Sequence, residues 1–157
     1  MRWLLLLLIS SITQADVLLS VGAGKGIIDR NGTPFERVAE VGYQLPFAAD
    51  FFVRPEAGYF EDISGNGRSS FWVTPVMGVR ALSTVGPELH IAVGPGYLEN
   101  PDSVLGGHFQ FALEGGAAIS DGKTSLGLVW KHLSSAGIEM PNQGRDFIMI
   151  QWRILGL

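Results

Sequence analysis

The sequence predicts an all-β fold, an eight-stranded antiparallel transmembrane β-barrel, and three observations support this prediction. After residue 15, no apolar stretch of helical length occurs. Apolar and polar residues instead alternate over about ten residues at a time, which is typical of strands with lipid on one face and a polar interior on the other. The connections between these runs are alternately short and long, as in outer-membrane barrels.

The chain starts with the apolar segment MRWLLLLLISSITQA. Arg2 precedes an unbroken apolar run, and small or polar residues precede Ala15, which is the pattern of a secretory signal peptide. The run is too short to cross a bilayer as a helix. We therefore expect residues 1–15 to be a signal peptide and residues 16–157 to form a single outer-membrane barrel domain.

The first four strands are expected where alternation is continuous. They are Asp16 to Gly24, Glu36 to Leu45, Phe51 to Glu61 and Ser70 to Leu82. In the third strand Phe51 and Val53 share a parity opposite to that of Arg54 and Glu56. Because strand side chains alternate between the two faces, the apolar set is expected towards lipid and the charged set inside.

The last four strands follow the same rule. They are Glu88 to Leu98, Gly107 to Ile119, Thr124 to Leu133 and Asp146 to Leu155. Short connections such as PFAAD, STVGP and SDGK alternate with longer segments at 27–35, 62–68, 99–105 and 135–145. The short turns and both termini are expected in the periplasm, and the long loops outside the cell.

The inward parity collects charges of both signs, which we expect to pair inside a narrow barrel. These residues are Glu40, Glu56, Glu88, Glu114, Arg54, Arg80, Lys131 and Arg153. His90 and His108 are expected to be hydrogen-bonded residues of this core. Interfacial aromatic belts are expected to contain Trp72, Tyr97, Trp130 and Trp152.

Composition excludes several classes of function. The chain has 11 Lys and Arg, one of them Arg2 in the leader, against 15 Asp and Glu, so nucleic acid is not an expected partner. It has no Cys, which excludes disulfides and thiolate metal sites. The sequence contains no ordered metal-ligand spacing, and we expect no metal and no cofactor.

A base, an alcohol and an acid flank the last long loop, in the segment WKHLSSAGIEMPNQGRD. His132 and Ser134 are two residues apart and continue the outward parity of Leu126, Leu128 and Trp130. Asp146 precedes the outward residues Ile148 and Ile150 of the neighbouring strand. These groups could perform nucleophilic ester hydrolysis on the lipid-facing wall, or they could simply mark where two strands leave the membrane. The apolar neighbours could line an acyl-chain groove or only contact lipid.

This segment resembles the C-terminal motif of the PagL-type lipid A 3-O-deacylases, which are eight-stranded outer-membrane barrels. The resemblance rests on residues around one loop: His132, Ser134, Ala136, Gly137, Pro141, Asn142, Gly144 and Asp146. It implies that Ser134 is the nucleophile, His132 its base and Asp146 the orienting acid, with Gly137 and Asn142 as oxyanion donors. The implied activity is hydrolysis of the 3-O-linked 3-hydroxyacyl chain of lipid A, in the outer leaflet of a Gram-negative outer membrane.

Three positions depart from the family pattern. Ser135 replaces the usual Asn, Asp146 replaces the usual Glu and must reach His132 with a shorter side chain, and Leu157 replaces the terminal aromatic residue of many barrels. Two other functions remain open: a non-enzymatic adhesion or envelope barrel, and another lipid enzyme such as an acyltransferase or phospholipase. Acyl-length preference, regulation and oligomeric state, a homodimer included, are not determined by the sequence.

Overall fold

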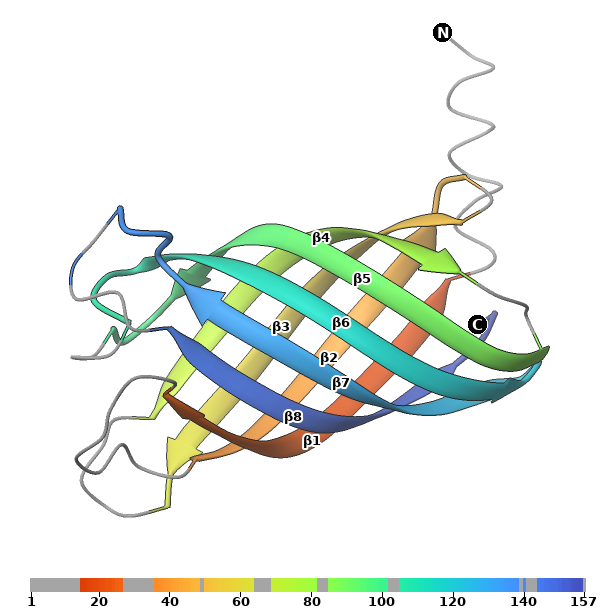
Figure 1. Cartoon of the computed structure of the whole chain (residues 1–157), viewed down its shortest axis with the longest axis horizontal. Helices are drawn as coiled ribbons and strands as arrows, with labels where there is room; N and C mark the ends of the chain where they lie inside the picture. The colour runs from red at the N-terminus through yellow and green to blue at the C-terminus, as the bar shows by residue number, and fades with distance from the viewer. Residues whose placement is uncertain are drawn as a thin grey trace, which may run out of the picture.

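The barrel is closed and all its neighbouring strands are antiparallel. The computed structural model describes residues 15–26, 36–48, 50–63, 69–81, 85–101, 105–138, 140 and 144–156. Eight strands follow one another around the barrel, and β1 closes it by pairing with β8 (Figure 1). The predicted fold class is therefore confirmed. All but one residue of the predicted signal peptide lies outside the described residues.

Each strand lies close to its predicted range. The strands are β1 (Asp16–Gly26), β2 (Glu36–Pro46), β3 (Phe51–Asp62), β4 (Ser70–Ala81), β5 (Val85–Leu98), β6 (Phe109–Asp121), β7 (Thr124–Ser134) and β8 (Arg145–Ile154). The largest difference is at the start of β5, because its pairing with β6 continues to Val85 opposite Asp121. Among the described residues there is no helix with the length and apolar character needed to span a bilayer.

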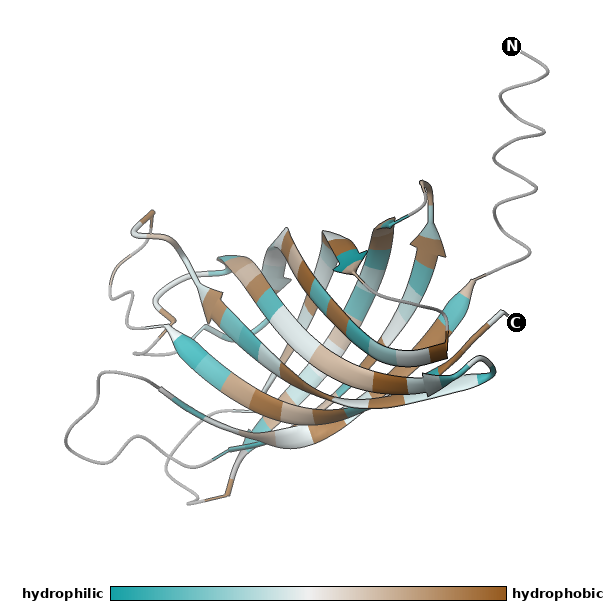
Figure 2. Cartoon of the chain, turned by 45° about the vertical axis from the view of Figure 1, so that its right-hand side comes forward, coloured by the Kyte–Doolittle hydropathy of each residue, from teal (hydrophilic) through white to brown (hydrophobic). Residues whose placement is uncertain are grey.

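The two ends of the barrel differ. The strand ends joined by the short connections, β2 to β3, β4 to β5 and β6 to β7, lie with the start of β1 and the end of β8 at one end, here called the short-turn end (Figure 1). The strand ends joined by the longer connections lie at the opposite end, here called the long-loop end. Hydrophobic and hydrophilic residues alternate along the strands, as the colour bands of Figure 2 show. In β2 this gives a strict alternation of buried and exposed side chains from Glu36 to Gln44.

A network of ion pairs fills the middle of the barrel. Lys131 contacts Glu40, Glu56 and Glu114, and Arg54 contacts Glu56 and Glu114. These five side chains are all buried. Mutual pairing offsets the desolvation of the charges, as predicted from their inward parity. His90 joins the same network through Nε2, which lies 2.8 Å from a Glu114 oxygen.

An aromatic layer lies above these charges towards the long-loop end. Trp72 is 2% exposed and stacks on Phe147, with ring centroids 5.8 Å apart and planes 11° apart, and Phe60 packs against both. The prediction that Trp72 belongs to an interfacial belt is therefore wrong. Its parity is that of Thr74, which also points inside, and in this narrow barrel the indole fills space between opposite walls.

His108 also differs from its predicted place. It is exposed and precedes β6, which begins at Phe109. Its Nδ1 lies 2.8 Å from the Leu98 carbonyl oxygen, and its ring stacks on the outward Tyr97. The inward parity does not apply to His108 because the residue lies just outside the strand.

Candidate active site

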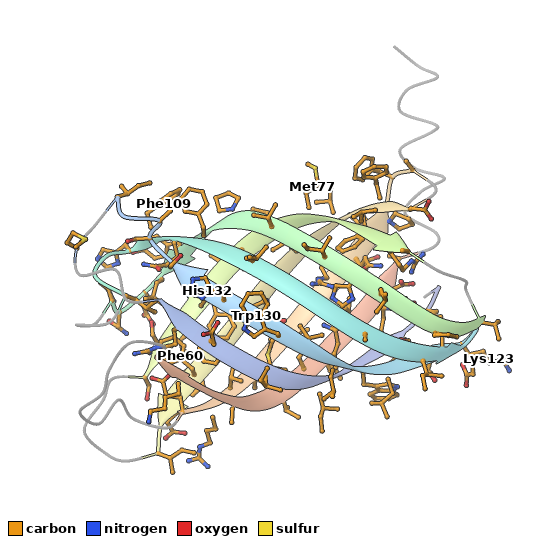
Figure 3. All side chains as sticks on the ribbon, in the orientation of Figure 1. Phe60, Met77, Phe109, Lys123, Trp130 and His132 are labelled. Atoms are coloured by element: carbon orange, nitrogen blue, oxygen red, sulfur yellow. The ribbon has the colours of Figure 1, made fainter. Side chains whose placement is uncertain are left out.

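The register of β7 and β8 brings His132 and Asp146 together on the outer wall. The two residues are direct cross-strand partners near the long-loop end. The His132 Nδ1 atom lies 3.1 Å from Asp146 Oδ1, and the side chains are 23% and 26% exposed. Directly opposite residues have Cβ atoms about 5 Å apart, so an aspartate is long enough to reach the imidazole. Figure 3 shows His132 on β7, away from Lys123 at the short-turn end.

Ser134 is the last residue of β7 and follows His132 by two positions. Both side chains are half-buried and have the outward parity, and Ser134 is paired with Phe111 of β6. Within the described residues no hydrogen bond joins Ser134 Oγ to His132. Such contacts in unliganded hydrolases often form only when substrate is present. The structure therefore brings the candidate base His132 and the candidate acid Asp146 into contact and leaves the Ser134 hydroxyl beside them.

A tight turn follows Ser134. The Ile138 N–H donates to the Ser135 carbonyl oxygen at 3.0 Å, and the two central residues, Ala136 and Gly137, have φ values of 52° and 80°. Two successive positive φ angles define a type I′ turn, which favours glycine. Ala136 is the only described non-glycine residue in this conformation, so the chain carries local strain two residues after Ser134. Asn142, the other predicted oxyanion donor, lies outside the described residues.

Gly144 packs against the imidazole from the far side of the loop. It has a φ of 70°, and a Cβ atom added to it would lie 2.5 Å from His132 Cε1 and 3.0 Å from Nε2. Both distances are shorter than ordinary van der Waals contacts. A side chain at position 144 would therefore displace the imidazole ring. Glycine is required here both by this close contact and by the positive φ angle.

The inner wall holds these strands in place. The inward neighbours of the site are Lys131, Leu133, Arg145 and Phe147, each at most 1% exposed. Arg145 pairs with Glu36 at 2.7 Å and lies over the Phe60 ring. Ser135, at the position that departs from the family pattern, is also completely buried. Tight packing behind both strands limits movement of the outward groups.

The five predicted groove residues all point outwards from the wall. These are Leu126, Leu128, Trp130, Ile148 and Ile150. Leu126, Leu128 and Ile150 line an apolar groove of about 560 Å³ that extends over Leu89, Ala117 and Ile119. Trp130 and Ile148 are closer to His132 and do not line it. Sequence reasoning placed this groove over β7 and β8, whereas the depression extends across β5 and β6.

The carboxylates inside the barrel form a separate cluster. One oxygen each from Glu40, Glu56 and Glu114 lies within 4.8 Å of the others, a spacing that could suit a cation. Lys131 Nζ contacts all three, at 2.5 Å from Glu56 and 3.2 Å from Glu114. The ammonium group therefore supplies the positive charge that a cation would bring.

From the sequence, Trp130 is predicted only to line the groove and to belong to an aromatic belt. In the structure its indole Nε1 donates to Asp146 Oδ1 at 2.9 Å. Parity places Trp130 beside His132, and pairing of β7 with β8 makes it a diagonal neighbour of Asp146. The contact between Trp130 and Asp146 depends on the pairing register of β7 with β8, which the sequence prediction did not include.

Comparison with known proteins agrees with the fold. The sequence profile of the family described as "Lipid A 3-O-deacylase (PagL)" matches residues 37–154. A search of curated protein sequences gives no significant match. Among solved structures, the outer-membrane enzyme PagL is 20% identical, with 88% of this chain and 98% of that chain covered and a TM-score of 0.61.

Two further barrels superpose at lower identity. The Neisserial surface protein A (NspA) is 6% identical, with a TM-score of 0.64 over 90% of this chain and 95% of that chain. The N-terminal β-barrel domain of Pseudomonas aeruginosa OprF is 9% identical, with a TM-score of 0.57 over 88% and 97%. These two likenesses concern the fold alone, whereas the profile covers the site.

Proposed function

The chain belongs to the lipid A 3-O-deacylase (PagL) family, and from this premise we propose that it removes the 3-O-linked 3-hydroxyacyl chain of lipid A by Ser-His-Asp hydrolysis. The observation that carries the proposal is the contact between His132 Nδ1 and Asp146 Oδ1, 3.1 Å long, on the outer wall beside Ser134. In this mechanism His132 Nδ1–H donates a hydrogen bond to the Asp146 carboxylate, which leaves Nε2 as the basic nitrogen of the ring.

In the first half of the reaction, Ser134 Oγ attacks the ester carbonyl carbon while His132 Nε2 takes the hydroxyl proton. The resulting oxyanion would be stabilised by the Gly137 N–H and the Asn142 side-chain amide. When the intermediate collapses, the C–O bond to the sugar breaks and His132 returns the proton to the departing sugar 3-oxygen. The acyl chain is then esterified to Ser134.

In the second half, water replaces the sugar. His132 Nε2 takes a proton from the water as it attacks the acyl-enzyme, and the proton then passes to Ser134 Oγ as the ester breaks. The products are a lipid A molecule lacking one acyl chain and a free 3-hydroxy fatty acid. No metal or cofactor is required for either half.

The outward position suits a lipid substrate. Lipid A in the outer leaflet would reach Ser134 by lateral diffusion if the long-loop end faces the cell exterior. The buried charges and the aromatic layer fill the barrel interior beneath the site. The substrate would therefore reach Ser134 along the outer wall and not through the barrel interior. We propose this orientation together with the activity.

The acyl chain would follow the outer face of β6. Gly115 points outwards between Ile91 and Trp130 in the register, and a Cβ atom at this position would have no atom within 4 Å. The next outward residue is the small Ala117, which lies in the apolar groove. From Leu113, opposite His132, to Ala117 the strand rises about 13 Å. An acyl chain could occupy this low path between larger side chains.

Mass spectrometry of lipid A from cells producing the protein tests the function. We expect loss of one 3-hydroxyacyl group. Gain of an acyl group would indicate an acyltransferase, and loss of acyl chains from phospholipids instead would indicate a phospholipase. An unchanged lipid profile, from a barrel that still shows the heat-modifiable gel shift of a folded protein, would favour a binding role. Each of these three results contradicts the proposal.

A further inference from the structure

We infer that Trp130 is a positioning residue of the candidate triad: its indole fixes the Asp146 carboxylate in place for His132. The inference rests on the proposed function, because it assigns a role within the same reaction. Trp130 would neither form a bond with the substrate nor transfer a proton. It would act through Asp146 and through the orientation of the imidazole.

The three side chains form one compact group on the outer wall. Trp130 and His132 are on the same face of β7, and Asp146 is opposite His132 on β8. Trp130 Nε1 donates to Asp146 Oδ1 at 2.9 Å, and the same oxygen lies 3.1 Å from His132 Nδ1. The indole and imidazole rings stack, with centroids 6.1 Å apart and planes 23° apart. Figure 3 shows the two labelled rings side by side.

The direction of the indole N–H distinguishes this role from that of a belt residue. A tryptophan of an interfacial belt places its N–H among headgroups or water. Here the N–H is directed along the wall to a carboxylate that also contacts the base. Hydrogen bonds to a charged acceptor are stronger than neutral ones, and more so where lipid lowers the local dielectric.

Two contacts on one oxygen restrict how Asp146 can rotate. With His132 as its sole partner, the carboxylate could turn about its Cβ–Cγ bond and present either oxygen at varied angles. The indole donor fixes which oxygen is shared, and the stacked ring limits tilting of the imidazole. The Asp146 carboxylate, which has a short side chain on the lipid-facing wall, is thereby fixed in the position where it can stabilise the imidazolium that forms during catalysis.

The first test compares two tryptophan variants. Trp130→Phe keeps an aromatic ring but removes the N–H, and Trp152→Phe is the matched control, because Trp152 is an outward tryptophan opposite Leu126 towards the short-turn end. With purified protein and lipopolysaccharide in detergent, we expect Trp130→Phe to lower kcat about tenfold with KM unchanged. Trp152→Phe should keep the wild-type kcat. Equal kcat values for the two variants would overturn the inference.

A double-mutant cycle separates positioning from general damage to the fold. If Trp130 acts through Asp146, adding Trp130→Phe to Asp146→Asn should lower kcat no further than Asp146→Asn alone. If the fold-loss in kcat of the double variant equals the product of the two single losses, Trp130 does not act through Asp146. Folding is checked for all variants by the heat-modifiable gel shift.

A readout independent of activity tests the contact itself. In the NMR spectrum of the refolded barrel, Asp146→Ala should shift the Trp130 indole N–H resonance more than that of Trp152, and should speed its exchange with solvent. An unmoved Trp130 resonance would overturn the inference even if the protein deacylates lipid A. If wild-type protein leaves lipid A intact, the proposed function fails, and the resonance still decides whether Trp130 holds Asp146.

Discussion

Replacing Gly144 with alanine should greatly reduce the activity of the protein while leaving the barrel folded. A Cβ atom at this position would lie 2.5 Å from His132 Cε1, whereas ordinary contacts begin at 3.4 Å. Because Gly144 belongs to the backbone entering β8, the imidazole is the part that yields, by about 1 Å. A displacement of about 1 Å in a catalytic group can reduce the rate about 100-fold, or about 2.7 kcal/mol in activation free energy.

The cost to stability should be smaller than the cost to catalysis. Alanine at a φ of 70° adds about 1–2 kcal/mol of backbone strain. Gly156→Ala is the matched control, because Gly156 has a φ of 65° and no atom within 4 Å of an added Cβ. It introduces similar strain at the opposite end of the barrel without touching His132.

The assay is release of 3-hydroxy fatty acid from lipopolysaccharide by purified protein in detergent, combined with urea unfolding of the refolded barrel. Gly144→Ala should lose about 100-fold in kcat, and Gly156→Ala should stay within about twofold of wild type. If Gly144→Ala keeps the kcat of Gly156→Ala, then His132 does not act from the position seen in the structure.

Three other substitutions probe the acid, the acyl path and the interior. Asp146→Ala should lower kcat by about 100-fold, less than the loss in Ser134→Ala, because an orienting carboxylate can matter less than the nucleophile; equal losses in the same deacylation assay would contradict this ranking. Gly115→Leu fills the open position on β6 and should reduce hydrolysis of long-chain substrates while sparing short-chain esters; a chain-length profile equal to wild type would exclude the proposed path. Lys131→Met leaves three buried glutamates without their ammonium partner and should lower the free energy of unfolding by about 3–5 kcal/mol in urea titrations, whereas Lys123→Met at an exposed turn should have little effect; matching unfolding curves would refute the role of the ion pairs.

The sequence alone predicted most of the fold, because a period-two pattern also states which face each side chain occupies. The parity of His132, Ser134 and Asp146 placed all three on the outer wall, and their places in the structure agree. The reach of Asp146 could not be decided in this way. It depends on cross-strand register, which puts Asp146 directly opposite His132 and is set by the whole barrel.

Other features depended on three-dimensional packing. Parity would have placed Trp72 inside, but the enrichment of tryptophan at membrane interfaces suggested a belt, and only the packing with Phe60 and Phe147 shows that the lumen accommodates the indole. The clash that fixes glycine at position 144 arises between a loop end and a strand, so no local pattern predicts it. The bond from Trp130 to Asp146 likewise links two strands.

The most direct test of the central claim is lipid A deacylation by purified Ser134→Ala, measured by mass spectrometry beside wild type. Ser134 Oγ is the single protein atom that the proposed chemistry requires to form a covalent bond with the substrate. We expect wild type to release one 3-hydroxyacyl chain, and Ser134→Ala, with an unchanged heat-modifiable gel shift, to release none. Full activity in folded Ser134→Ala would contradict nucleophilic catalysis by this residue.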